Sequence, residues 1–254
     1  MANARRILGP ESSIKARRAL GHRVVASSIE SVLEFGENRR LSTAALRARI
    51  ESVQGLDAYE RARQLGRGAI LVTAHVGPFE VALCSVMSRE RRVHVVFRRD
   101  AMSAFERLRS EHRRRLGIIE APIDDGLAVW FRLRDALLAD EVVILQGDRT
   151  MPGQRGVAVP FLHGSMRLPE GPVKLARVTG SPLIPAFATW TPARRVNIEL
   201  REPLFVGGAV SEGLAPEIAM RRVADELADV VARYPEQWLV LERAWIEDRG
   251  EQGA

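Results

Sequence analysis

The sequence predicts an α/β fold: a single domain with a largely parallel central sheet, flanked by helices and preceded by an N-terminal helical segment. From residue 69 onward, short apolar runs rich in β-branched residues alternate with longer stretches of helical period. The first 68 residues carry the helical period alone. We therefore expect one domain over residues 1–254, with a helical segment at 1–68 and an α/β core at 69–246.

Each element follows from its local pattern. In the N-terminal segment we expect helices at 12–35, 41–54 and 57–65. In the core we expect strands at 69–74, 92–97, 141–146, 156–162, 182–190 and 195–200. The helices between and after them are expected at 78–89, 103–116, 127–138, 169–178 and 216–232. Ligands of such sheets bind beyond the carboxyl ends of the strands. The residues after 74, 97 and 146 are therefore the first candidates for a site.

Composition excludes several classes of protein. With 46% hydrophobic and 28% charged residues, the chain is neither disordered nor fibrous. The single cysteine, Cys84, excludes an intramolecular disulfide framework and a cysteine-based zinc site. The P-loop pattern and the G-x-S-x-G elbow are both missing from the sequence. No apolar run approaches the roughly 18 residues of a membrane span, so we expect a protein of the cytoplasm or of the cytoplasmic membrane face.

The cations are almost all arginines. The net charge is +6, and Lys15 and Lys174 are the only lysines. Ten arginines and four acidic residues fall between residues 89 and 115. Because guanidinium groups bind phosphate and carboxylate in a bidentate manner, anionic partners are plausible: phospholipid headgroups, phosphopantetheine carriers or nucleic acid. The alternative is an ordinary solvated surface.

A histidine and a glutamate stand where the first core strand ends. His75 follows the strand at 69–74, and Glu80 falls in the first turn of the next helix, with Gly77 allowing a tight turn between them. A carboxylate bonded to one imidazole nitrogen leaves the other able to take a proton from a hydroxyl. The spacing is compatible with such a pair. It is equally that of a strand-end histidine and an acid favoured at a helix start.

Arginines follow two further strands. Arg98 and Arg99 come after the strand at 92–97, and the pattern does not fix which of the two faces the site. Gly147, Asp148 and Arg149 come after the strand at 141–146. All these residues are expected at the same edge of the sheet.

In this order, the segments resemble the four motifs of the glycerolipid and lysophospholipid acyltransferase superfamily. HVGPFE at 75–80 looks like its H-x4-D/E motif, VVFRR at 95–99 its second motif, VVILQGDR at 142–149 its third and SPLIPAFA at 181–188 its fourth. Phrases such as VPFLHG at 159–164 and YPEQW at 234–238 extend the likeness to lipid A late acyltransferases and phosphatidylinositol mannoside acyltransferases. The resemblance spans roughly residues 12–246.

The resemblance implies an O-acyltransferase that moves a fatty acyl group from acyl-CoA or acyl carrier protein to a hydroxyl of a lipid or glycolipid, with no cofactor. It implies that His75 is the general base and Glu80 its orienting partner. Arg98 and Arg149 would bind phosphate or stabilise charge around the tetrahedral intermediate, and Asp148 would orient a neighbour rather than act as a base.

Two departures bear on the acceptor. Gln146 stands where the superfamily has a glutamate, a position at which the lipid A branch also varies. The transmembrane helix that many lipid A enzymes carry is not in this sequence. Contact with an anionic membrane is therefore expected to be peripheral, through the basic first helices. The same departure counts against lipid A itself as the acceptor.

The remaining chemically active residues read as structural. The other histidines lack metal-ligand spacing, so no metal is expected, and Cys84 falls on an apolar helix face. We expect the four tryptophans, at positions 130, 190, 238 and 245, to be packing anchors. For the last two, the alternative is contact with a membrane interface.

Two other functions remain open. A protein that binds anions or nucleic acid without catalysis would use the same arginines, although the sequence has no aromatic residues interleaved with them. A thioester hydrolase would use the same histidine and carboxylate on water. Salt-dependent binding to DNA but not to anionic vesicles would favour the first, and thioester loss without a lipid product the second.

Overall fold

Nine strands are found in the computed structural model, which describes residues 1–150, 154, 156–208 and 213–248. Those of the central sheet are β1 (Ile50–Gln54), β2 (Ala69–Thr73), β3 (Val93–Phe97), β4 (Ile119–Pro122), β5 (Val142–Gln146), β8 (Leu183–Trp190) and β9 (Val196–Leu200). They lie in the order β1-β9-β8-β2-β5-β3-β4. Only β8 and β9 are antiparallel among these neighbours, so the expected largely parallel sheet is confirmed.

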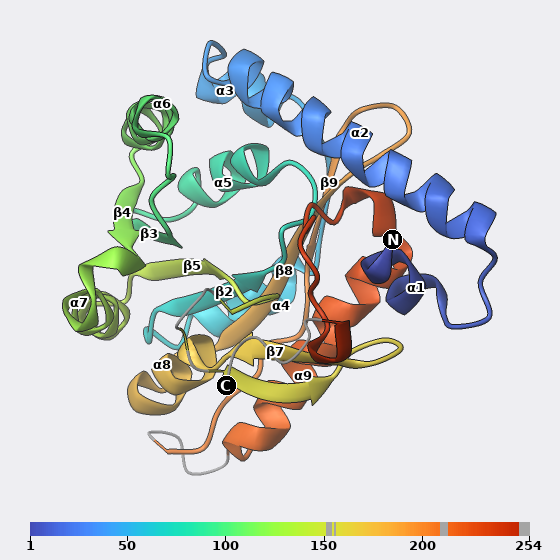
Figure 1. Ribbon diagram of the computed structural model, residues 1–254. Coiled ribbons are helices and arrows are strands. Elements are labelled where there is room, and N and C mark those ends of the chain that lie inside the picture. Colours follow the sequence, from blue (N-terminus) through green and yellow to red (C-terminus); the bar gives the residue numbers. More distant parts are fainter. Residues whose placement is uncertain (151–153, 155, 209–212, 249–254) are drawn as a thin grey trace.

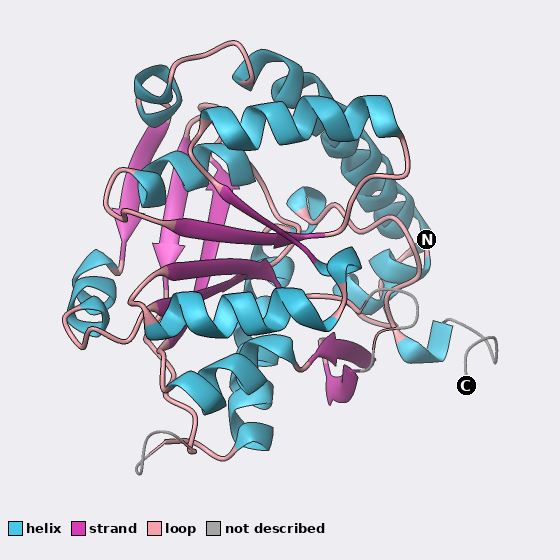
Figure 2. Cartoon of the chain, turned by 90° about the vertical axis from the view of Figure 1, so that its left-hand side faces the viewer, coloured by secondary structure: helices cyan, strands magenta, loops and turns pink. Residues whose placement is uncertain are grey.

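Helices cover both faces of this sheet (Figures 1 and 2). Within the described residues they are α1 (Ala2–Leu8), α2 (Ile14–Asn38), α3 (Thr43–Arg47), α4 (Leu56–Arg63), α5 (Phe79–Met87), α6 (Ser103–Arg115), α7 (Leu127–Leu138), α8 (Gly171–Thr179) and α9 (Pro216–Arg233). Three short 3-10 turns complete the described secondary structure. One follows β4 at Ile123–Asp125, one follows α9 at Pro235–Gln237, and one lies at the end of the described chain at Ile246–Asp248.

The expected helix at 41–54 is wrong. Only α3 is helical there, capped by the Ser42 hydroxyl, which accepts from Ala45 N–H at 3.1 Å. The chain then forms β1, which pairs in parallel with β9 at the edge of the sheet. The apolar residues Ile50 and Val53 fit either period over so short a run, and the open edge of β9 decides in favour of a strand.

The expected strand at 156–162 exists but does not join the central sheet. It forms β6 (Gly156–Pro160), which pairs in antiparallel fashion with β7 (Ser165–Pro169) in a separate hairpin. Because β7 uses residues up to 169, the following helix α8 begins at Gly171 rather than at 169. Neither β7, β4 nor α1 was expected from the sequence.

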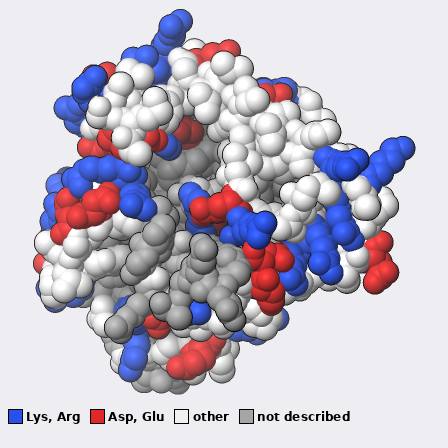
Figure 3. Space-filling view, viewed as in Figure 1, with Lys and Arg blue, Asp and Glu red and all other residues white. Residues whose placement is uncertain are grey.

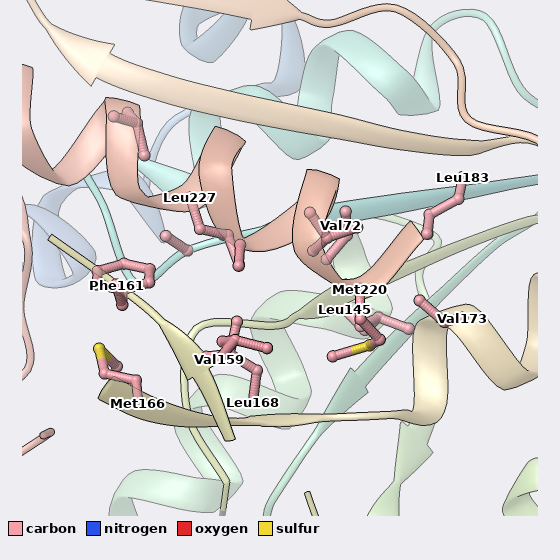
Figure 4. Packing of buried hydrophobic residues seen from close by; sticks show 14 of the residues in the cluster. Val72, Leu145, Val159, Phe161, Met166, Leu168, Val173, Leu183, Met220 and Leu227 are labelled. Atoms are coloured by element: carbon pink, nitrogen blue, oxygen red, sulfur yellow. The ribbon is translucent and has the colours of Figure 1, made fainter. Parts of the chain in front are cut away.

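The central strands bury both of their faces. Along β2, Ile70 and Val72 point into one core and Ala69 and Leu71 into the other. The first core is filled by the hairpin, α7, α8 and α9, with Phe161 among its largest buried side chains (Figure 4). Burial on both faces explains why these strands read as continuous apolar runs.

α2 has apolar residues on its exposed side as well as on its buried side. Its Leu20 and Phe35 are buried against the body of the protein, whereas Val25, Ile29 and Val32 are 50%, 59% and 57% exposed. These three residues lie on one side of the helix, because they are spaced by four and three positions. Among the described residues, no helix combines the length and hydrophobicity needed to cross a bilayer.

Candidate active site

The in-register pairing of β2 with β5 brings two distant segments together at the carboxyl edge of the sheet. Thr73 lies opposite Gln146, and Gly147 N–H donates to the Thr73 carbonyl at 2.8 Å. His75 and Asp148 each follow this last pair by two residues. They therefore leave the sheet side by side, although they are 73 positions apart in the chain.

Asp148 is the carboxylate that contacts His75. Its side chain is fully buried, and Oδ1 accepts from the His75 Nδ1 at 2.7 Å. Oδ2 accepts from the backbone N–H of His75 at 3.0 Å and from the Trp238 indole N–H at 2.8 Å. Burial alone raises the pKa of this carboxyl group, but the electrostatic attraction of His75 and the three hydrogen bonds outweigh it, so the pKa is lowered.

The ionised Asp148 fixes the tautomer of His75. A carboxylate only accepts hydrogen bonds, so the imidazole proton is on Nδ1 and the lone pair is on Nε2. Nη2 of Arg149 lies 3.3 Å from Nε2, and a guanidinium can only donate. Nη1 of Arg149 donates to Oε1 of Glu242 at 2.7 Å. The basic nitrogen of His75 is thus covered by a cation.

A cleft of about 360 Å³ opens in front of His75. Gln146 and Arg149 line it from the end of β5, and Arg98 and Arg99 from the end of β3. Arg99 donates to Asp125 at 2.8 Å, whereas Nε of Arg98 is 3.7 Å from Asp124, beyond hydrogen-bond distance. Both arginines that the sequence left as alternatives therefore face the cleft, and Arg98 is the less engaged of the two.

Gly77 makes the turn that separates His75 from α5. Its φ is +58°, and a Cβ at this position would lie 2.2 Å from the carbonyl oxygen of Ala188. Both features require glycine. The turn therefore depends on close approach to β8 as well as on backbone freedom.

The expected contact between Glu80 and His75 is not formed. Within the described residues it forms no hydrogen bond or ion pair, and Asp148 occupies the Nδ1 side of the imidazole. Glu80 instead lies one turn before Cys84, whose thiol pKa is raised to about 11, first by burial and further by the Glu80 charge. The carboxylate in contact with the His75 imidazole therefore comes from the neighbouring strand and not from the local turn.

An apolar pocket lies on the other side of the same strand end. Thr73 and Val76, which flank the His75 turn in sequence, line it. From there it extends across the sheet on the face covered by α4 and α5. Its other apolar lining residues include Val53, Leu56, Leu71, Phe79, Leu83, Ile144, Ala186, Ile198 and Leu200.

The segment after α9 closes the back of the site. The Leu239 N–H donates to the His75 carbonyl at 2.8 Å. Trp238 and Trp245 are 1% and 0% exposed and pack edge to face, which confirms them as packing anchors and excludes the membrane-interface alternative. The sequence did not single out the hydrogen bond of Trp238 to Asp148, nor Glu242. A local pattern holds no signal for contacts with a segment about 90 residues away.

No group of three or more His, Cys, Asp or Glu side chains is placed to hold a metal ion within the described part of the chain. In the part of the chain that the structure describes, one further histidine has a carboxylate partner: Nε2 of His94 is 2.5 Å from Glu141. That pair lies at the opposite, amino-terminal edge of the sheet. It shares no cleft with His75.

Comparison with known proteins agrees with the motifs. The sequence model of the family described as bacterial lipid A biosynthesis acyltransferase matches residues 1–247. The chain is 28% identical over 200 residues to the phosphatidylinositol mannoside acyltransferase of Mycobacterium tuberculosis (strain H37Rv), covering 78% of this chain and 61% of that protein. It is 28% identical over 201 residues to the protein of the same description from Mycolicibacterium smegmatis, covering 78% and 63%. The match thus spans about three fifths of the length of these relatives.

Replacing Asp148 by Asn is expected to destabilise the fold by about 3 kcal/mol at pH 7, because all three of its partners are N–H donors and one of them would face the amide NH2. Urea unfolding of both proteins measures this difference. Since the folded pKa of Asp148 lies below the unfolded value of about 3.9, the advantage of the wild type is fully present above that pH. It is lost as the pH falls through the folded pKa.

Asp225→Asn is the matched control, since Asp225 is 51% exposed and, among the described residues, pairs only with Arg221 one turn away on α9. This variant should stay within about 0.5 kcal/mol of the wild type. Equal losses in the two variants would contradict a special role for the Asp148 environment.

Proposed function

Because the chain belongs to the bacterial lipid A biosynthesis acyltransferase family, we propose that it transfers a fatty acyl group from a thioester to a hydroxyl of a lipid or glycolipid acceptor. One observation carries the proposal. Nδ1 of His75 is held by a buried carboxylate, and Nε2 faces a cleft lined with arginines. This is the arrangement that a general base for a hydroxyl needs.

The reaction needs only one base. Nε2 of His75 takes the proton of the acceptor hydroxyl, and the oxygen attacks the thioester carbonyl carbon. The tetrahedral intermediate then breaks its C–S bond, and the departing thiolate takes the proton from the imidazolium. Asp148, rather than Glu80, stabilises the imidazolium between these steps. Arg149 lies beside the reacting groups and lines the same cleft, where its guanidinium can bind a phosphate oxygen of the donor.

The cleft suits a donor that carries phosphate. Acyl-CoA and the phosphopantetheine arm of acyl carrier protein both do, and we propose donors of this kind as substrates, with no bound cofactor. Arg98, Arg99 and Arg109 line the cleft with side chains 47%, 49% and 43% exposed, so their guanidinium groups are accessible. Guanidinium forks match phosphate oxygens in bidentate geometry.

The apolar pocket beyond Thr73 and Val76 is the proposed position of the acyl chain. It starts beside the His75 turn, and apolar side chains from β1, β9, β8, β2 and β5 line it. A chain lying there runs across the strands, with its thioester end near His75. The pocket is narrow, so the side chains at its mouth must move apart to admit a chain.

We propose that α2 carries the contact with an anionic membrane, on its cytoplasmic face. Val25, Ile29 and Val32 form an exposed apolar stripe on α2. The exposed cations Lys15 and Arg18 lie on the same side of the helix, nearer its start. Figure 3 shows cationic side chains over the first half of α2 and a largely uncharged second half. A helix with both features lies in a lipid interface.

His75→Ala and Asp148→Asn are expected to lower acyl transfer at least 100-fold, the usual contribution of a positioned base, while Glu80→Gln stays within about threefold of the wild type. Mass spectrometry compares the lipids of cells that express the wild type with those of cells that express each variant. A lipid that is acylated with the wild type and not with His75→Ala identifies the acceptor. The purified protein is then assayed for thiol release and lipid product. Full transfer by His75→Ala contradicts the mechanism, and thioester loss without an acylated lipid indicates a hydrolase.

Ala186→Leu should shorten the preferred acyl chain, because the added methyl groups fill the pocket that Ala186 lines. We expect the ratio of kcat/KM for 16-carbon over 8-carbon donors to fall about tenfold, the effect of one or two methylenes left unburied. Ala232→Leu makes the same change at an exposed position of α9 and should leave the ratio unchanged. An unchanged ratio in Ala186→Leu would remove the acyl chain from this pocket.

Sedimentation with phospholipid vesicles tests the α2 surface. The protein should bind vesicles containing half phosphatidylglycerol and not pure phosphatidylcholine. Replacing Lys15, Arg18 and Arg23 by Gln should weaken binding about 100-fold, at about 1 kcal/mol per cation. Changing Val25, Ile29 and Val32 to Asn should also weaken it. The same change in the equally exposed apolar residues of α7, Leu127, Phe131 and Leu138, is the control, and equal effects of both triples would contradict the assignment to α2.

A further inference from the structure

We infer that Glu242 is a positioning residue: it holds Arg149 across Nε2 of His75 until a phosphate-bearing substrate draws the guanidinium away. The inference rests on the proposed function, in which Nε2 is the base. It adds that the resting site is covered, and it names the carboxylate that keeps it so.

Arg149 blocks His75 because Nε2 can accept only one hydrogen bond. Nε2 of neutral His75 has one lone pair, and Nη2 of Arg149 donates to it at 3.3 Å. An acceptor hydroxyl must donate its proton to the same lone pair. Arg149 therefore has to move aside before His75 can act as a base.

Glu242 is the stronger of the two contacts that hold the Arg149 guanidinium. Its Oε1 accepts from Nη1 at 2.7 Å, and it is the charged partner. The contact to His75 is longer and joins a cation to a neutral ring. Charge-assisted hydrogen bonds are about twice as strong as neutral ones. Losing the carboxylate should therefore release Arg149 from its position over the imidazole.

The backbone that carries Glu242 is itself fixed. The amide of Asn3 in α1 donates to the carbonyl oxygens of Val240 and Glu242 at 2.9 and 2.7 Å, and its Oδ1 accepts from Ala244 N–H at 3.1 Å. The Glu242 side chain is nevertheless 56% exposed. A fixed backbone with an accessible carboxylate can hold Arg149 and still let it go.

Arg149 is also prepared to bind an anion. Its Nε is buried and makes no hydrogen bond in the described part of the structure. A buried donor without an acceptor is unfavourable, so a phosphate oxygen gains by reaching it. Arg149 lines the same cleft as Arg98 and Arg99, so a phosphate group bound there competes directly with Glu242 and His75 for the guanidinium.

Carbethoxylation by diethyl pyrocarbonate tests the cover without any assay of transfer, because the reagent needs the free lone pair of a neutral imidazole. The rate at His75 is measured by mass spectrometry of the purified protein and normalised to exposed His22. Glu242→Gln should raise the normalised rate about fivefold, the population change equivalent to about 1 kcal/mol. An unchanged rate overturns the inference.

Two variants separate positioning from loosening. Glu236→Gln makes the same charge change in the same segment, at a residue without a hydrogen bond or ion pair in the described structure, and should leave the rate unchanged. Arg149→Met should raise the rate as much as Glu242→Gln does, and adding Glu242→Gln to it should have no further effect. A persistent effect in the double variant, or an equal effect of Glu236→Gln, overturns the inference.

Donor selectivity tests the displacement by phosphate. The wild type should use acyl-CoA far better than the N-acetylcysteamine thioester of the same chain, which carries no phosphate. Glu242→Gln should narrow this ratio by raising kcat/KM for the phosphate-free donor about fivefold. An unchanged ratio, with both donors turned over, overturns displacement by phosphate. Absence of transfer from either donor counts against the proposed function instead and leaves the carbethoxylation result standing.

Discussion

The pairing of β2 with β5 is the constraint from which the site follows. These strands lie at the centre of the sheet and are buried on both faces, so a shift of one residue would turn every apolar side chain toward the wrong core. The register that satisfies both cores also places Thr73 opposite Gln146. Two residues further on, His75 and Asp148 are then in contact. The same apolar packing that stabilises the fold thereby fixes the geometry of the chemistry.

A buried carboxylate is costly unless it is fully paired, and the fold meets that requirement from three directions. Asp148 receives N–H groups from the His75 side chain, from the His75 backbone and from Trp238. The last of these comes from the segment after α9, which α1 fixes through Asn3. The two ends of the described chain therefore complete a site whose principal residues lie on central strands.

The excess of arginine is less of a free basic surface than the composition suggests. Arg113 pairs with Glu106 and Glu120, and Arg99 with Asp125. Such pairs consume much of the positive charge between residues 89 and 115. The remaining accessible cations are concentrated in two places. Some guanidinium groups face the cleft in front of His75, and other cationic side chains lie on the first half of α2 (Figure 3). The position of these cations, more than the net charge of the protein, supports the proposals of a phosphate-bearing donor and of contact with an anionic membrane.

Local patterns were sufficient for the fold class, for most core elements and for the set of strand ends where a site could form. They made His75, Arg98, Asp148 and Arg149 candidates, because each follows a continuous apolar run that predicts a buried strand, and the structure places all four at the carboxyl edge of the sheet. They did not separate Glu80 from Asp148 as the partner of His75, since the sequence shows which residues are near one another in the chain and not which strands are neighbours.

Contacts between distant segments had to come from the folded chain. The edge position of β1, the hydrogen bond from Trp238 and the ion pair of Glu242 with Arg149 all depend on packing between segments far apart in sequence. A run such as residues 50–54 suits a helix or a strand almost equally, and the open edge of β9 decides between them. Residue identity and spacing therefore define which groups can do the chemistry, whereas burial and long-range pairing determine which of them meet.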